Sequence, residues 1–145
     1  METILRKFLN ENQWRDIYDI IKELWINLVH EDFLDANWLY LNIFWENYIF
    51  VKKWLSKKME RFTLWHELCH FLLWESWFSI NLDFHRKSII EQRADDFSVS
   101  LFCWNDSNII NNYNDYENIP TLSNLYWIPE KFIEKRLNIL FKNKI

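Results

Sequence analysis

The sequence predicts an α+β fold, in which a small three-stranded antiparallel or mixed sheet packs on a buried helix. Residues 14–24 place isoleucines at helical spacing, and three short runs rich in β-branched and aromatic residues follow them. Residues 57–74 are apolar around nearly the whole helical circumference, which is typical of a buried helix. A second long helix, roughly residues 87–103, and a C-terminal helix complete the predicted fold.

Three strands are predicted between the first helix and the buried helix, at residues 26–30, 39–44 and 48–51. β-branched and aromatic residues fill these runs, and polar breaks separate them. We expect a hairpin around Asn37-Trp38 and a more clearly marked hairpin around residues 45–47.

The remaining boundaries are predicted from capping and breaking residues. Ser56 precedes the buried helix and is expected to cap its N-terminus, because a serine side chain can accept a hydrogen bond from the first turn. Residues 75–86 are predicted to form a loop, and residues 105–118, rich in Asn and Asp, a loop or a short weak helix. Pro129 is expected to open the final helix. The predicted inner face of that helix comprises Phe132, Ile133, Leu137 and Leu140.

Length and composition are those of an ordinary folded protein, with 145 residues, 50% hydrophobic and 26% charged. We expect a single domain over residues 1–145, with its core at about residues 14–141. Charges interrupt the apolar runs and no secretory signal is recognisable, so no membrane partner is expected. The net charge of −4 gives no footprint for direct nucleic-acid binding. Two cysteines are too few for a disulfide framework, which favours the cytoplasm.

The composition is abnormal in one respect, because the chain has no glycine and ten tryptophans. Average usage predicts about ten glycines at this length. Several tryptophans also stand where glycine is expected. Trp25 closes the first helix, Trp38 lies in a predicted hairpin, and Trp54, Trp77 and Trp104 lie at similar breaks. We hypothesise that many or all of them stand for glycine, through a reassigned codon; the alternative is a truly tryptophan-rich protein.

The segment RFTLWHELCHFLL, residues 61–73, contains the pattern HExxH. His66 and His70 are four residues apart, so on a helix both imidazoles can bind one zinc ion at about 2.0–2.1 Å. Glu67 then lies beside the metal, where a general base for the attacking water is needed. Burying these three side chains without partners would cost several kcal/mol, which metal ligation avoids. The alternative is two core histidines with satisfied hydrogen bonds and a surface glutamate.

The third ligand is expected from residues downstream of His70. Glu91 and Asp95 lie one helical turn apart at the edge of a core stripe, where two carboxylates repel each other unless a cation is near. We therefore predict Glu91 as third ligand and Asp95 as acceptor for a ring N–H of a ligating histidine. The alternatives are His85 as ligand, or a solvated charged face, and Glu75 is expected to diverge from the site. The full set of candidates is Glu75, Asp83, His85, Glu91, Asp95 and Asp96.

These segments resemble one known family. RFTLWHELCHFLL is similar to the active-site helix of the ImmA/IrrE metallo-endopeptidases, and EQRADDFSVSLF resembles that family's segment whose glutamate, here Glu91, is the third zinc ligand. LYWIPEKFIEKRL is similar to the family's closing helix, so the resemblance covers most of residues 14–141. Trp65 and Cys69 depart from the small residues usual beside the histidines, and Phe102-Cys103-Trp104-Asn105 replaces a proline-containing turn.

The resemblance implies a zincin-like fold, Zn²⁺ as cofactor, and a cytoplasmic endopeptidase that hydrolyses a peptide bond. It also implies the protein substrate, a helix-turn-helix transcriptional repressor. Glu67 is expected to take the proton of the attacking water, and an exposed strand at residues 48–51 to pair with an extended substrate. The alternative is a non-proteolytic zincin-like binding module, or a toxin component, that sequesters a repressor.

Overall fold

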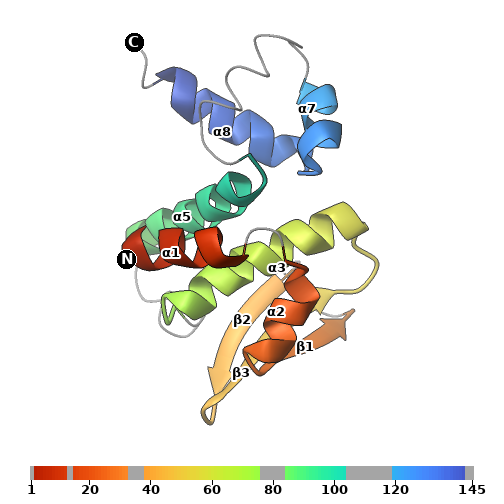
Figure 1. Ribbon diagram of the computed structural model, residues 1–145, viewed down its shortest axis with the longest axis vertical. Coiled ribbons are helices and arrows are strands. Elements are labelled where there is room, and N and C mark those ends of the chain that lie inside the picture. The colour runs from red at the N-terminus through yellow and green to blue at the C-terminus, as the bar shows by residue number, and fades with distance from the viewer. Residues whose placement is uncertain (1, 13–14, 33–37, 76–83, 104–118, 143–145) are drawn as a thin grey trace.

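The computed structural model describes residues 2–12, 15–32, 38–75, 84–103 and 119–142, and within these ranges it confirms the α+β class (Figure 1). Helix α3 packs against two strands on one side and α5 on the other, and α8 in turn contacts α5. No helix in the described ranges is long and apolar enough to span a membrane. The elements are α1 (Glu2–Asn12), α2 (Ile17–Glu23), β1 (Ile26–Glu31), β2 (Trp38–Ile43), β3 (Glu46–Lys52), α3 (Lys57–Leu72), α5 (Phe84–Cys103), α7 (Ile119–Tyr126) and α8 (Glu130–Lys142).

The sheet is mixed, with the strand order β1-β3-β2. β2 and β3 form an antiparallel hairpin with Ile43 opposite Glu46, whereas β1 runs parallel to β3. The predicted hairpin around Asn37-Trp38 is therefore wrong, because β3 lies between β1 and β2; Asn37 itself lies outside the described residues. The expectation that residues 48–51 form an exposed edge is also wrong, since β3 pairs on both sides. Within the described residues, β1 and β2 are the edge strands of the sheet.

The main core lies between the sheet and α3. Ile49 and Val51 of β3 are fully buried, and Leu64 and Leu68 of α3 belong to the same cluster. Each such side chain contributes about 1.5–3 kcal/mol relative to an exposed one. Ser56 caps α3 as predicted: its Oγ accepts a hydrogen bond from the backbone N–H of Met59 at 3.1 Å. Burial and capping together fix the axis of α3 over the sheet.

A second cluster joins α3 to the C-terminal helices. Phe62 of α3 stacks on Phe132 of α8 with ring centroids 3.9 Å apart. Ile133 and Leu137 are buried with them as predicted, while the side chain of Leu140 lies outside the described residues. Helix α8 begins at Glu130, one residue after Pro129, whose carbonyl accepts the N–H of Phe132. The predicted loop or helix at 105–118 lies outside the described ranges.

The left-handed backbone positions fall almost entirely on tryptophans. Such a conformation costs a residue with a Cβ roughly 1–2 kcal/mol, and glycine is its usual occupant at helix C-termini and two-residue hairpin turns. The described residues with positive φ, other than Phe44, are all Trp. They are Trp25 (58°), Phe44 (50°), Trp45 (68°), Trp54 (69°), Trp74 (57°) and Trp127 (56°).

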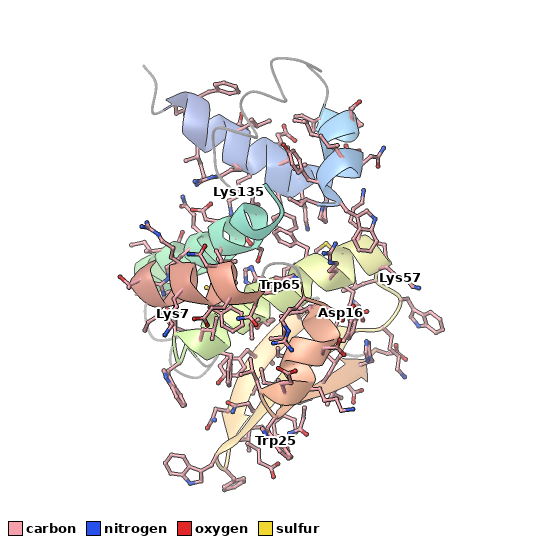
Figure 2. All side chains as sticks on the ribbon, viewed as in Figure 1. Lys7, Asp16, Trp25, Lys57, Trp65 and Lys135 are labelled. Carbon is pink, nitrogen blue, oxygen red and sulfur yellow. The ribbon has the colours of Figure 1, made fainter. Side chains whose placement is uncertain are left out.

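The turn positions expected at Trp25 and Trp54 are thus confirmed, whereas Trp38 begins β2 and is not a turn residue. Trp25 is 88% exposed and lies at the periphery in Figure 2, whereas Trp65 is buried among the helices. The ring of Trp65 packs beside Phe97 of α5, so α3 and α5 accommodate an indole between them.

Candidate metal centre

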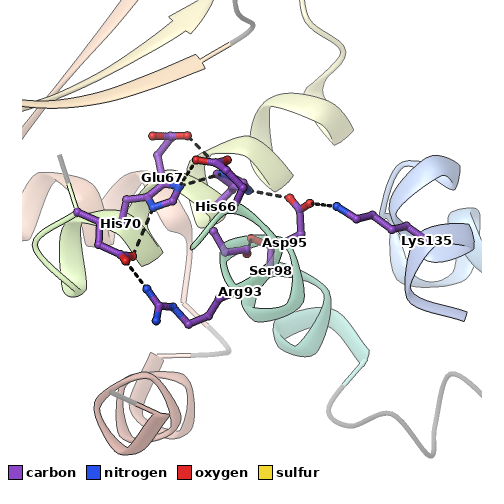
Figure 3. Close-up of polar contacts among 10 residues, drawn as sticks. His66, Glu67, His70, Arg93, Asp95, Ser98 and Lys135 are labelled. Atoms are coloured by element: carbon purple, nitrogen blue, oxygen red, sulfur yellow. Dashed lines mark hydrogen bonds and ion pairs between the residues drawn. The ribbon is translucent and has the colours of Figure 1, made fainter. Parts of the chain in front are cut away.

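The HExxH segment lies in the buried part of α3, as the apolar circumference of this helix predicted. His66 and His70 are each 2% exposed, and their Nε2 atoms lie 3.1 Å apart. Helical spacing brings the two imidazoles to one face, which is turned toward α5 (Figure 3). Two buried imidazoles at this separation present their ring nitrogens to a common point.

Glu91 of α5 completes the group. Its Oε2 lies 2.9 Å from Nε2 of His66 and its Oε1 lies 3.3 Å from Nε2 of His70. These three residues form a set whose ligand atoms all lie within 4.8 Å of one another, close enough to hold a metal ion. The Glu91 side chain is 36% exposed, so the site opens toward solvent beside this carboxylate.

The spacing suits a tetrahedral zinc ion. Ligands about 2.0–2.1 Å from zinc lie about 3.3–3.4 Å from one another in tetrahedral geometry. The closest approaches between His66, His70 and Glu91 are 2.9, 3.1 and 3.3 Å. Small side-chain movements would therefore admit the ion, and three protein ligands leave a fourth position for water or substrate.

Glu67 lies beside these ligand atoms. Its Oε1 is 3.8 Å from Nε2 of His66, and the residue is only 3% exposed. Burial raises the pKa of its carboxyl, although the neighbouring His66 and His70 oppose this shift. A carboxylate with a raised pKa next to a metal site has the position and proton affinity of a general base.

Asp95 lies on the opposite edge of His66. Its Oδ1 is 2.8 Å from Nδ1 of His66, and its Oδ2 accepts a hydrogen bond from Nζ of Lys135 on α8 at 2.8 Å (Figure 3). Burial raises the pKa of Asp95, but the bonds to His66 and Lys135 outweigh it and leave this pKa below its ordinary value. A charged carboxylate thus fixes the orientation of the His66 ring.

A residue that sequence analysis set aside also faces the site. Glu75 lies just after α3, and its Oε1 is 3.5 Å from Nδ1 of His70. It was expected to diverge because a continued helix would carry it away. Instead the backbone turns at Trp74, so that the N–H of Glu75 donates to the carbonyl of His70 at 2.8 Å. A glycine at position 74 would have been the sequence signal for this turn.

Among the described residues, the candidate ligand set contains only His66, His70 and Glu91. His85 lies in α5 and not in a loop, but its side chain, like all of Asp83, is outside the described residues. Asp96 points elsewhere and pairs with Arg136 of α8 at 3.1 Å. Cys69 is buried in the main core.

Two histidines of an HExxH helix and a glutamate from a following helix are the ligand arrangement of zincin-type metallohydrolases. The sequence matches the family model for the IrrE N-terminal-like domain of peptidase family M78 over residues 21–138. The chain therefore belongs to this ImmA/IrrE metallopeptidase family, and the predicted resemblance is confirmed. No curated protein matches the sequence.

Proposed function

We propose that this protein is a zinc-dependent endopeptidase in which His66, His70 and Glu91 bind the metal and Glu67 is the general base. The observation that carries the proposal is the convergence of the three ligand atoms within 4.8 Å, with Glu67 adjacent. Membership of a metallopeptidase family supports the same reaction class. Residues 1–145 would act as one catalytic domain.

A zinc ion held by His66, His70 and Glu91 would supply Lewis acidity, which lowers the pKa of a water molecule from about 15.7 toward 7 and polarises a peptide carbonyl. The chain's own residues do the rest. Glu67 takes the proton of the attacking water and passes it to the leaving amine, and burial favours the first of these transfers by raising the pKa of Glu67. Asp95 holds the ring of His66 in the orientation that presents Nε2 to the ion.

We propose that an extended substrate forms backbone hydrogen bonds with β2, and not with β3. β2 is an edge strand, contacts α3, and carries Trp38, whose ring lies 5.8 Å from the ring of His66. An extended peptide could add to this edge and bring its backbone to the metal. We further propose a helix-turn-helix repressor as substrate and the cytoplasm as the site of action, as the family resemblance implies.

The test is incubation of the zinc-loaded protein with purified helix-turn-helix repressors from the same organism, followed by mass spectrometry of any fragments. Glu67→Gln should keep one zinc ion per chain by elemental analysis and lose cleavage by at least about a hundredfold, the loss expected when a general base is removed. Glu60→Gln is the matched control, because Glu60 lies on α3 but pairs with His30 at 2.5 Å, outside the ligand set.

Three outcomes would count against different parts of this proposal. Cleavage that survives in Glu67→Gln would remove Glu67 from the role of base. A repressor that is bound but not cut by the zinc-loaded wild type would indicate the sequestering module instead. A wild type that binds no zinc would overturn the metal site itself.

A further inference from the structure

We propose that Glu75, held by Arg93, is a positioning residue that accepts a hydrogen bond from Nδ1 of His70 and orients this imidazole for metal binding. This inference rests on the proposed metal site and adds a residue to it. It assigns to His70 the kind of support that Asp95 gives to His66.

The first observation is that Nδ1 of His70 has no hydrogen-bond partner within the described residues. This nitrogen and the Oε1 of Glu75 are both buried, and Oε1 also has no hydrogen-bond partner within the described ranges. The two atoms lie 3.5 Å apart, just beyond a normal hydrogen bond. A buried donor and a buried acceptor that face each other at this distance need a movement of about 0.5 Å to bond.

The second observation is how the chain holds Glu75 in place. The backbone after α3 turns through Trp74, and the N–H groups of Trp74 and Glu75 donate to the carbonyls of Phe71 and His70. This pair of bonds is the Schellman pattern that ends many helices. It returns the chain toward the helix axis, so Glu75 lies beside His70 although it follows the helix.

The third observation is the partner of Glu75. Arg93 of α5 forms an ion pair with Oε2 of Glu75, which leaves Oε1 turned toward His70. The side chain of Glu75 is only 11% exposed, and Arg93 lies two residues after the ligand Glu91. One helix therefore supplies both a ligand and the cation that holds the supporting carboxylate.

A hydrogen bond from Nδ1 of His70 to Glu75 would determine which ring nitrogen binds the metal. A carboxylate that accepts the Nδ1 proton of His70 fixes the tautomer with its lone pair on Nε2. That nitrogen is the one facing His66 and Glu91. The same bond increases the basicity of Nε2 as a ligand and prevents rotation of the ring.

The test is zinc affinity, measured by competition with a chromophoric chelator. Glu75→Ala should lower the affinity about tenfold to a hundredfold, and Glu75→Gln should lose less because an amide oxygen still accepts the bond. In NMR spectra of the zinc-loaded protein, the Nδ1–H resonance of His70 should be protected in the wild type and shifted in both variants. The matched control is Glu23→Ala, which removes the carboxylate of the exposed Arg15–Glu23 pair away from the site.

The results distinguish this inference from the proposed function. A wild type that does not bind zinc overturns both. A wild type that binds zinc while Glu75→Ala stays within twofold, with an unchanged His70 resonance, overturns only the role of Glu75. If Glu75→Ala fails to fold, Glu75→Gln and its His70 resonance decide the question.

A second inference has an independent basis in the backbone. We infer that Trp25, Trp45, Trp54, Trp74 and Trp127 stand where the protein made by the cell has glycine. All five have positive φ. Four of them are 76% to 95% exposed, so indole packing does not compensate for the strained backbone there; Trp127 is 39% exposed and has the guanidinium of Arg61 5.2 Å from its ring centroid. The chain has no glycine at any of its 145 positions. This composition fits a codon that the cell reads as glycine and that the genetic code used for the printed sequence reads as tryptophan.

Peptide mass spectrometry of the protein from its natural source tests this directly, since each exchange removes the mass of an indolylmethyl group less one hydrogen. Glycine at these positions is expected, and tryptophan there overturns the inference. In a recombinant protein, Trp25→Gly and Trp54→Gly should each raise the midpoint of thermal unfolding by a few degrees. The buried Trp65, whose φ is not positive, is the contrasting position, where Trp65→Gly should lower it. Midpoints that fall at Trp25 and Trp54 would contradict the inference.

Discussion

The two imidazoles of the candidate metal centre are equally buried but differently supported. His66 is held from outside its helix by Asp95 at 2.8 Å, and Asp95 is in turn held by Lys135 of α8. His70 faces Glu75 at 3.5 Å, and this residue belongs to the turn that ends the same helix. One imidazole thus depends on the packing of three helices, and the other on one turn of backbone and an ion pair.

This difference shows which of the two imidazoles is already oriented in the metal-free protein. The His66 ring already has its hydrogen bond to Asp95, so its orientation is fixed before a metal ion arrives. The His70 ring requires a small closure of Glu75. Glu91 is common to both, since its two oxygens face the two Nε2 atoms.

Removing the shared ligand should have the largest effect. Glu91→Ala leaves two imidazoles without their common carboxylate, and we expect stoichiometric zinc binding to be lost, by more than about a hundredfold in affinity. Elemental analysis after dialysis checks this. Retention of one zinc ion per chain would show that the ligand set is different.

Removing the support of one imidazole should have a smaller effect. Asp95→Asn keeps the shape but loses the charge, and we expect zinc affinity to fall about tenfold to a hundredfold. Because the bond of Asp95 is 2.8 Å and the contact of Glu75 is 3.5 Å, Asp95→Asn should cost more than Glu75→Gln. Chelator competition on both variants and the double variant measures the ranking. A larger loss of zinc affinity in Glu75→Gln than in Asp95→Asn would show that His70, and not His66, has the stronger support.

The stability of the metal-free protein and the zinc affinity should depend on pH with opposite signs. Without a metal ion, burial lowers the pKa of both imidazoles, but Asp95 and Glu91 at His66, and Glu75 and Glu91 at His70, outweigh it and raise the values to about 10 and about 9. These exceed the unfolded value of about 6.5, so the folded chain binds more protons than the unfolded chain. The stabilisation is complete below about pH 6.5 and is lost as pH rises through 9 to 10.

Thermal unfolding at several pH values checks this. The midpoint of the metal-free protein should fall between about pH 6.5 and pH 9, whereas zinc affinity should increase, because zinc displaces protons from the imidazoles. A metal-free midpoint that rises over this interval would contradict the carboxylate–imidazole contacts.

The outermost contact should have the smallest effect. The side chain of Lys135 is 51% exposed, so its ion pair with Asp95 should stabilise the fold by less than about 1 kcal/mol. We expect Lys135→Ala to lower zinc affinity less than about tenfold, through a looser Asp95. Arg136→Ala is the matched control, since Arg136 lies on the same helix and pairs with Asp96, which is not in the ligand set. Equal zinc affinities of the two variants would remove Lys135 from the site.

The parts of the molecule that follow from local pattern could be predicted from the sequence. The cap at Ser56 and the facing of His66 and His70 are consequences of helical spacing, and the structure has both. Glu91 could be selected because two carboxylates on one helical edge require a cation or a donor nearby. The structure supplies such partners in the imidazoles and Lys135.

Strand order and the short helices could not be predicted in this way. A run of β-branched residues looks the same at the centre of a sheet as at its edge, so β3 was mistaken for an exposed strand. α1 and α7 were missed because short helices gain most of their stability from tertiary contacts. Here these contacts are the burial of Leu5 in the main core and of Leu122 against α8.

Glu75 was missed for a different reason. Its approach to His70 depends on the left-handed backbone of Trp74, and a tryptophan gives no signal of such a turn. The composition that obscures the turns of this chain thus also obscured one residue of its site.

Every residue from Phe62 to His70 on α3 is buried, so the segment that carries the chemistry is also the centre of the packed interior. Almost any exchange along it would disturb ligand geometry and folding together. For the proposed peptidase, we therefore expect sequence variation mainly in the surface connections, which tolerate change better than packed elements. Such a protein can acquire new selectivity at its periphery while its reaction centre stays unchanged.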